Sequence, residues 1–118
     1  MRDISPEEIE KFIIEHCPYE GWKDSKKIRP WINMMMGKGF IDAFTDDGTK
    51  LSVVLCSRMR EENCLVIDLL LSTRDNILES IATHLIQKHG TPQNVHWKRG
   101  ERQTTVRLER VAKHLLHN

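Results

Sequence analysis

The apolar residues near the start of the chain recur with the period of an α-helix. The inward face of this helix consists of Ile9, Phe12, Ile13 and His16. Ser5 and Glu8 have the spacing of a capping box, and Pro6 occupies the first helical position, where its missing N–H has no cost. Because Pro18 cannot continue the helix, the pattern predicts a helix over residues 6–17.

The next helical pattern is less regular, and after it the period changes from that of a helix to that of a strand. We expect a helix over residues 26–36 that is broken or kinked near Pro30, because proline lacks an N–H for an internal helical bond. Alternating and apolar runs then predict strands over residues 39–45, 50–58, 64–71 and 94–99. The sequence Asp-Asp-Gly-Thr at 46–49 is typical of a hairpin turn. The third strand is almost entirely apolar, which favours a central strand buried on both faces.

Two further helices are expected in the second half of the chain. Ser72 is predicted to cap a helix over residues 75–89, with Asp75 in the capping-box position and Gly90 as the stop. Near the C-terminus a helical stripe consists of Leu108, Val111, Ala112, Leu115 and Leu116. Residues 104–108 fit either a strand or the approach to this last helix.

These elements predict one α+β domain over residues 1–118, with a twisted, mainly antiparallel sheet flanked by helices. A chain of 118 residues with 39% apolar and 30% charged side chains can bury one core. The net charge of +1 argues against a generally basic nucleic-acid binder. The apolar run near residues 65–71 is far shorter than the roughly 18–20 residues that span a bilayer. Since the N-terminus is polar from its first residues, we expect a cytoplasmic protein with no membrane partner.

Neither the cysteines nor the histidines have a metal-binding or disulfide pattern. The three cysteines, Cys17, Cys56 and Cys64, are odd in number and lack a C-x-x-C spacing, so we expect reduced and mostly buried thiols. His84 and His89 are five residues apart on a predicted helix, where metal-binding pairs are three or four apart. We therefore expect no metal site. His96, next to an aromatic residue, is either a half-exposed strand residue or part of a groove.

Asp68 is the candidate catalytic residue because its carboxylate lies within the apolar third strand. A buried carboxylate is costly unless it is paired or functional. Asp68 is therefore either paired, with Arg58 or a backbone donor, or a general base that accepts a proton from an attacking amine. Asp42, on the first strand, is a weaker second candidate. No serine or cysteine lies in a nucleophile motif.

The order of elements resembles the central part of the GNAT family of acyl-CoA N-acyltransferases. The resemblance lies in an antiparallel meander, a buried strand that runs into a helix, and a further strand. It centres on residues 69–79, Leu-Leu-Leu-Ser-Thr-Arg-Asp-Asn-Ile-Leu-Glu. In that family the corresponding strand and helix hold the pyrophosphate of acyl-CoA, and N–H groups at a helix start are suited to anions.

The resemblance implies acetyl-CoA or another acyl-CoA as cofactor and a small amine as substrate. By position, the cofactor-binding residues would be Leu69, Leu71, Arg74, Asp75 and Asn76, with Asp68 as the base. The family's loop places small residues where this chain has Ile77 and Glu79. A β-branched side chain and a negative charge at these places weaken the expectation of cofactor binding.

Two alternatives remain open beside the acyltransferase hypothesis. One keeps the same fold for a non-catalytic interaction or structural protein, with a protein partner of unspecified identity. The size of the chain and the segments at 95–99 and 107–110 resemble small acetyltransferase-like proteins of tailed phages, for which the compartment would be the host cytoplasm. The other alternative is a nucleic-acid-binding module, with Trp97 stacking on a base. Its basic residues would be Lys98, Arg99, Arg102, Arg107, Arg110 and Lys113. This alternative is the least favoured, because Glu101 and Glu109 interrupt the basic region.

Overall fold

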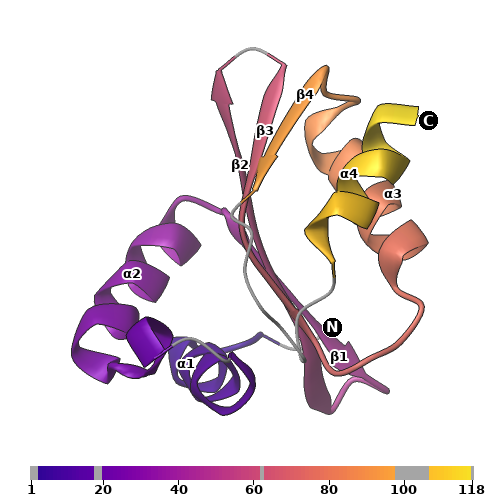
Figure 1. Cartoon of the computed structure of the whole chain (residues 1–118). Coiled ribbons are helices and arrows are strands. Elements are labelled where there is room, and N and C mark those ends of the chain that lie inside the picture. Colours follow the sequence, from indigo (N-terminus) through magenta and orange to yellow (C-terminus); the bar gives the residue numbers. More distant parts are fainter. Residues whose placement is uncertain (1–2, 18–19, 62, 98–106, 118) are drawn as a thin grey trace.

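The computed structural model describes residues 3–17, 20–61, 63–97 and 107–117. Four helices, one short 3-10 helix and four strands follow one another in this part of the chain (Figure 1). In chain order they are α1 (Pro6–His16), η1 (Glu20–Lys23), α2 (Ser25–Gly37), β1 (Ile41–Asp46), β2 (Lys50–Glu61), β3 (Cys64–Ser72), α3 (Leu78–His89), β4 (Asn94–Trp97) and α4 (Leu108–His117).

The strands form one mixed sheet with the order β1-β2-β3-β4. Both β1–β2 and β2–β3 are antiparallel, whereas β4 pairs parallel with the first half of β3, from Cys64 opposite Asn94 to Ile67 opposite Trp97. The parallel pair arises because α3 carries the chain back from the end of β3 to the start of β4. The α+β class is therefore confirmed, with one parallel pairing in the sheet. The predicted central position of the third strand is also confirmed.

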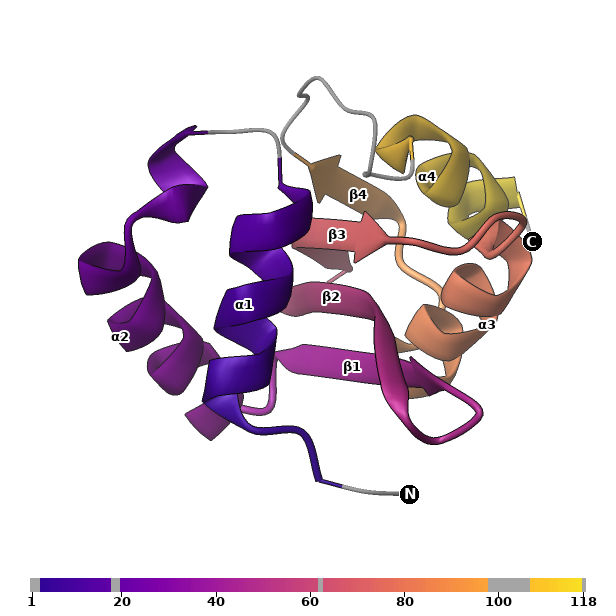
Figure 2. The same cartoon turned by 90° about the horizontal axis from the view of Figure 1, so that it is seen from below.

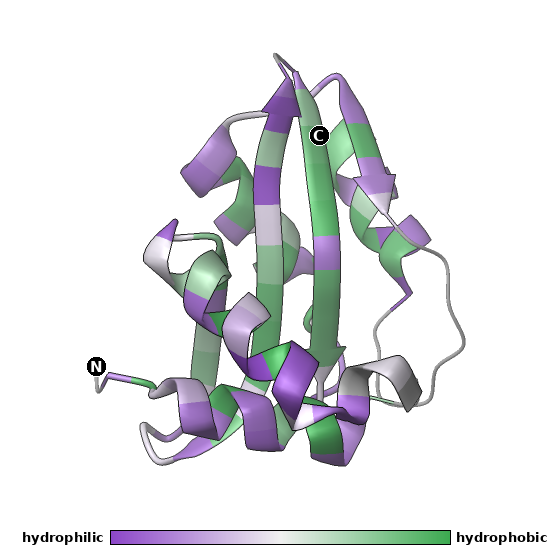
Figure 3. Ribbon diagram, turned by 90° about the vertical axis from the view of Figure 1, so that its left-hand side faces the viewer, coloured by the Kyte–Doolittle hydropathy of each residue, from purple (hydrophilic) through white to green (hydrophobic). Residues whose placement is uncertain are grey.

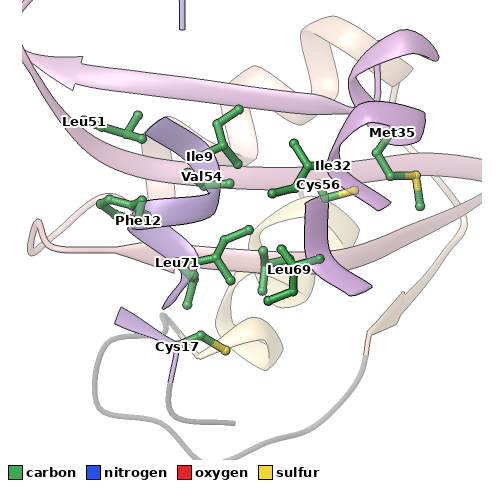
Figure 4. Close-up of a cluster of buried hydrophobic side chains, with 12 residues drawn as sticks. Ile9, Phe12, Cys17, Ile32, Met35, Leu51, Val54, Cys56, Leu69 and Leu71 are labelled. Atoms are coloured by element: carbon green, nitrogen blue, oxygen red, sulfur yellow. The ribbon is translucent and has the colours of Figure 1, made fainter. Parts of the chain in front are cut away.

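Helices cover both faces of the sheet, with α1 and α2 on one side and α3 and α4 on the other (Figures 1 and 2). The first core lies under α1 and α2 and includes Ile9, Ile32 and Leu71, all buried (Figure 4). The second core lies under α3 and α4 and includes Leu85 and Leu115. β3 is hydrophobic along most of its length (Figure 3) because it contributes side chains to both cores.

The two N-terminal helices form largely where the sequence predicts them. The Ser5 hydroxyl accepts the N–H of Glu8 at 3.2 Å, as expected for an N-cap, and α1 ends at His16. The expected break at Pro30 is wrong: α2 runs continuously from Ser25 to Gly37. Proline removes one internal N–H bond, but the exposed Pro30 lies away from the core, and the buried face of α2 holds the helix in place.

The predicted capping of α3 by Ser72 is wrong. Ser72 is the last residue of β3, and its hydroxyl accepts the N–H of Arg74 at 2.9 Å and donates to the C=O of Arg74 at 3.0 Å. Asn76 then has a left-handed φ of 57°, which a helix does not allow. As a result α3 begins at Leu78 rather than at residue 75, and no side chain caps it. We call residues 73–76 the β3–α3 turn.

The remaining boundaries differ by a few residues from those expected. The hairpin at 46–49 is present, with the Thr49 N–H donating to the Asp46 C=O at 2.9 Å, and β2 extends to Glu61. In α4, Val111, Ala112 and Leu115 are buried as predicted, but Leu116 is 44% exposed. The alternative strand at 104–106 lies outside the described residues. Within the described ranges, no helix is long and apolar enough to cross a membrane.

Candidate functional site

Asp68 is the extra residue of a β-bulge in the centre of the sheet. Cys56 of β2 lies opposite Leu69, and the next residue, Ser57, lies opposite Ile67, so Asp68 has no partner residue of its own. Leu69 belongs to the first core and Ile67 to the second. The bulge therefore lets Asp68 and Leu69 share the side of the sheet that α1 and α2 cover, where Arg58 also lies.

The carboxylate of Asp68 is held by Arg58 in a two-point ion pair. The Nε of Arg58 donates to Oδ2 at 2.8 Å and its Nη2 to Oδ1 at 3.3 Å, with Asp68 only 22% exposed. The hydrogen bond to Asp68 is the main reason that the pKa of Arg58 is raised. The sequence left open whether Asp68 is paired or acts as a general base, and the structure pairs it with Arg58. A general base at this position would therefore have to act while engaged with the guanidinium.

Cys56 lies next to this ion pair and has the properties of a buried thiol. Its Sγ donates to Oδ2 of Asp68 at 3.9 Å. Burial, followed by the nearby charge of Asp68, raises the pKa of Cys56 to about 12. The group therefore stays protonated at neutral pH and does not act as a nucleophile. The three cysteines are thiols that form no disulfide, and Cys17 and Cys56 are buried, as the sequence predicts.

The five residues expected to bind cofactor fall into two groups. Leu69 and Leu71 have side chains buried in the first core, so only their backbone groups could meet a ligand. Arg74, Asp75 and Asn76 are exposed in the β3–α3 turn. The turn is anchored to the sheet because the N–H of Thr73 donates to the C=O of Ser52 at 2.9 Å.

Arg74 is the charged group of the turn that is best placed for an anion. Its Nε lies 3.4 Å from Oδ1 of Asp46, and both side chains are 48% exposed. Such an exposed ion pair contributes little, about 0–1 kcal/mol, and can be exchanged for another anion. The guanidinium is thus held beside the turn without being fixed there.

The start of α3 carries features for and against anion binding. Ile77, in the N-cap position, is 5% exposed and packs in the second core, so its side chain points away from the surface of the turn. The N-cap residue, Ile77, makes no side-chain hydrogen bond to the first N–H groups of α3. Glu79 is exposed in the first turn, where its negative charge opposes an incoming anion.

A polar cluster between α3 and β1 was missed by sequence reasoning. We call Asp42, His84 and Lys88 the His84 cluster: Oδ2 of Asp42 lies 3.0 Å from Nε2 of His84 and accepts from Nζ of Lys88 at 2.8 Å. The ring of His84 also meets that of Phe44 edge-on, with the centroids 5.1 Å apart. The only sequence signal was that His84 and Lys88 are four residues apart on one helix face, and it does not reveal Asp42 as their partner.

His89 forms a second contact of α3 with the sheet. Its Nε2 lies 3.1 Å from the hydroxyl of Ser57, which is fully buried. Burial is the main reason that the pKa of His89 is lowered, and the neighbouring charge of Lys88 acts in the same direction. The imidazole therefore stays neutral, and the pair fastens α3 to β2. Because the serine is inaccessible, the pair is not an exposed nucleophile.

The other candidates remain apart from these groups. His96 is exposed on β4, and Trp97 is half-buried against the second core, so its ring is only partly open for stacking. Arg107, Arg110 and Lys113 are exposed at α4, whereas Lys98, Arg99 and Arg102 lie outside the described residues. Among the residues that the structure describes, no three potential ligands are grouped for a metal ion.

Comparison with protein-family models, with curated proteins and with solved structures finds no match to this chain.

Proposed function

We propose that the protein is an acyl-CoA N-acyltransferase-like domain that binds the phosphate-bearing end of an acyl-CoA at the β3–α3 turn. The observation that carries the proposal is the combination of an exposed turn, a helix start without a side-chain cap and the loosely held guanidinium of Arg74. Backbone N–H groups at a helix start and an arginine are both suited to phosphate.

The fold around the turn supports this proposal. β3 is the buried strand that leads through the turn into α3. The next strand, β4, lies beside β3 on the side away from β2, and this order of elements is the one that the resemblance implies. The sequence alone raised Ile77 as an obstacle, but its side chain packs in the second core and leaves the surface of the turn clear. Glu79 is the remaining opposing feature, and we expect it to limit the affinity.

A second candidate is the same fold without catalysis, as an interaction or structural domain. The ion pair of Asp68 with Arg58 favours it, because the carboxylate proposed as general base is already engaged. In this case acyl-CoA would bind without transfer, or would not bind at all. The third hypothesis, nucleic-acid binding, gains no support from the exposed basic residues at α4 alone.

Calorimetric titration with acetyl-CoA tests the proposal. We expect binding in the micromolar range, and Arg74→Ala should weaken it by about 1.5–3 kcal/mol, as for loss of a charge-assisted hydrogen bond. The matched control is Arg60→Ala, which removes the same charge from an exposed site on β2. Absence of heat at millimolar acetyl-CoA, or equal weakening by both variants, would contradict the site.

Transfer is measured separately from binding. Incubation of the protein with acetyl-CoA and a panel of small amines should release free CoA thiol if the domain is an enzyme. Binding that depends on Arg74 but yields no thiol above the uncatalysed rate would support the non-catalytic candidate and leave the binding site intact.

A further inference from the structure

β1 is an edge strand of the sheet, and the backbone groups on its outer side have no backbone partner among the residues that the structure describes. β1 pairs with β2 alone, at the end of the sheet (Figure 2). The N–H of Ser57 donates to the C=O of Phe40 at 2.9 Å, so by antiparallel alternation Asp42 and Phe44 also direct their backbone groups to β2. The outward set is therefore Ile41, Ala43 and Thr45. No backbone partner for these three occurs in residues 3–17, 20–61, 63–97 or 107–117.

The exposure of β1 comes from this edge rather than from its faces. All six of its residues are half-buried. Ile41 and Ala43 pack against the first core and Phe44 against the second, so both faces are covered. What remains open to solvent is the line of backbone groups between them.

β1 also lacks two of the features by which edge strands usually avoid pairing, a proline and a lysine. The bulge beside it is formed by β2, where Ser52 has no partner residue. The one charge of β1 away from the hairpin, Asp42, is compensated by Lys88. The edge is thus regular, uncharged in its middle and ready to accept another strand.

We propose that two copies of this chain associate by antiparallel pairing of their β1 strands about a two-fold axis at Ala43. In this register Ala43 lies opposite Ala43 of the second copy, and Ile41 lies opposite Thr45, so outward groups meet outward groups. About six backbone hydrogen bonds would join the two sheets.

The charges of β1 select this arrangement over others. In the antiparallel register Asp42 lies opposite Phe44 of the second copy. The acidic C-terminal end of β1, at Asp46 and Asp47, then meets the N-terminal end of the other β1, which follows Lys38. Parallel pairing of the same two edges would instead place the two acidic ends at Asp46 and Asp47 side by side, and like charges at these distances are destabilising. The antiparallel pair has its two-fold axis along the normal of the sheet, so the two sheets continue as one.

Sedimentation analysis of the unmodified chain over a wide concentration range is the primary test. We expect a monomer–dimer equilibrium, and Ala43→Pro should raise the dissociation constant about tenfold or more, because it removes one outward N–H from each copy. This proline leaves the bonds of β1 to β2 in place, since the Ala43 N–H does not point to β2. A chain that remains monomeric up to millimolar concentration overturns the proposal.

A second pair of variants guards against loss of folding. Thr45→Lys places a charge on the edge, whereas the control Thr83→Lys places the same charge on the exposed side of α3. We expect only Thr45→Lys to weaken the dimer, with circular dichroism of both variants unchanged.

For the register, Ala43→Cys in a Cys64→Ser background should form an intermolecular disulfide, and Thr83→Cys in the same background should not. Equal effects of the edge and α3 variants would place the interface elsewhere and contradict the proposal.

Discussion

At the scale of single residues, Asp68 is a carboxylate inside an otherwise apolar strand, and Arg58 of the neighbouring strand holds its charge. A lone carboxylate in an apolar strand must be paired or functional, and the sequence offered Arg58, at the end of the predicted preceding strand, as a partner. The bulge that brings the two together leaves no mark in the sequence. Asp42 was also singled out, but its partners His84 and Lys88 come from a distant helix, and only the packing of α3 on the sheet reveals them.

The Arg58–Asp68 pair should contribute to stability as a unit. We expect Arg58→Ala to lower the free energy of unfolding by about 1–2 kcal/mol, because Asp68 then keeps a partly buried charge without a partner. The double variant Arg58→Met, Asp68→Leu should be closer to the unmodified protein than Arg58→Ala is. Urea unfolding measures all three, with Arg60→Ala as the exposed control. If Arg58→Ala costs no more than Arg60→Ala, the pair is not a structural element.

At the scale of elements, periodicity predicted which helices and strands exist better than it predicted the residue at which each begins. The apolar stripe of α3 was recognised, yet its start was placed three residues early because Ser72 has the sequence features of an N-cap. A serine hydroxyl also bonds to nearby backbone outside helices, and here it closes a turn with Arg74 instead. For β4, the strand–helix–strand order of residues 64–97 was the available signal for its parallel pairing with β3.

The contact between His89 of α3 and Ser57 of β2 should make the free energy of unfolding depend on pH. Burial lowers the pKa of His89 in the folded protein, so the unfolded chain binds a proton more readily, near an ordinary value of about 6.5. The free energy of unfolding should therefore fall as pH decreases below about 6.5, until the folded pKa is passed. His89→Gln, which keeps a hydrogen-bonding group for Ser57, should flatten this dependence.

Denaturant unfolding between pH 5 and pH 8 measures the effect, with the exposed His96→Gln as control. We expect the control to retain the slope of the unmodified protein. An unchanged slope in His89→Gln would show that groups other than His89 determine the pH dependence.

At the scale of the whole molecule, β3 couples the two cores. Leu69 and Leu71 face the first core, whereas Leu65, Ile67 and Leu70 face the second. The apolar run of this strand predicted its burial on both faces, but the sequence does not tell which helices cover which face. Because β3 supplies side chains to both cores, disrupting one core removes the packing that holds β3 in place. The other core then loses the side chains that β3 contributes to it.

This coupling predicts that a cavity in one core unfolds both. Leu115 is fully buried in the second core, and Leu115→Ala should lower the free energy of unfolding by about 2–5 kcal/mol. Trp31 packs against the first core and Trp97 against the second, so single-tryptophan variants report on each side. In urea, both fluorescence transitions and the far-ultraviolet circular dichroism should move together to lower denaturant. A shift confined to Trp97, with Trp31 unfolding at its original midpoint, would show that the two cores are independent.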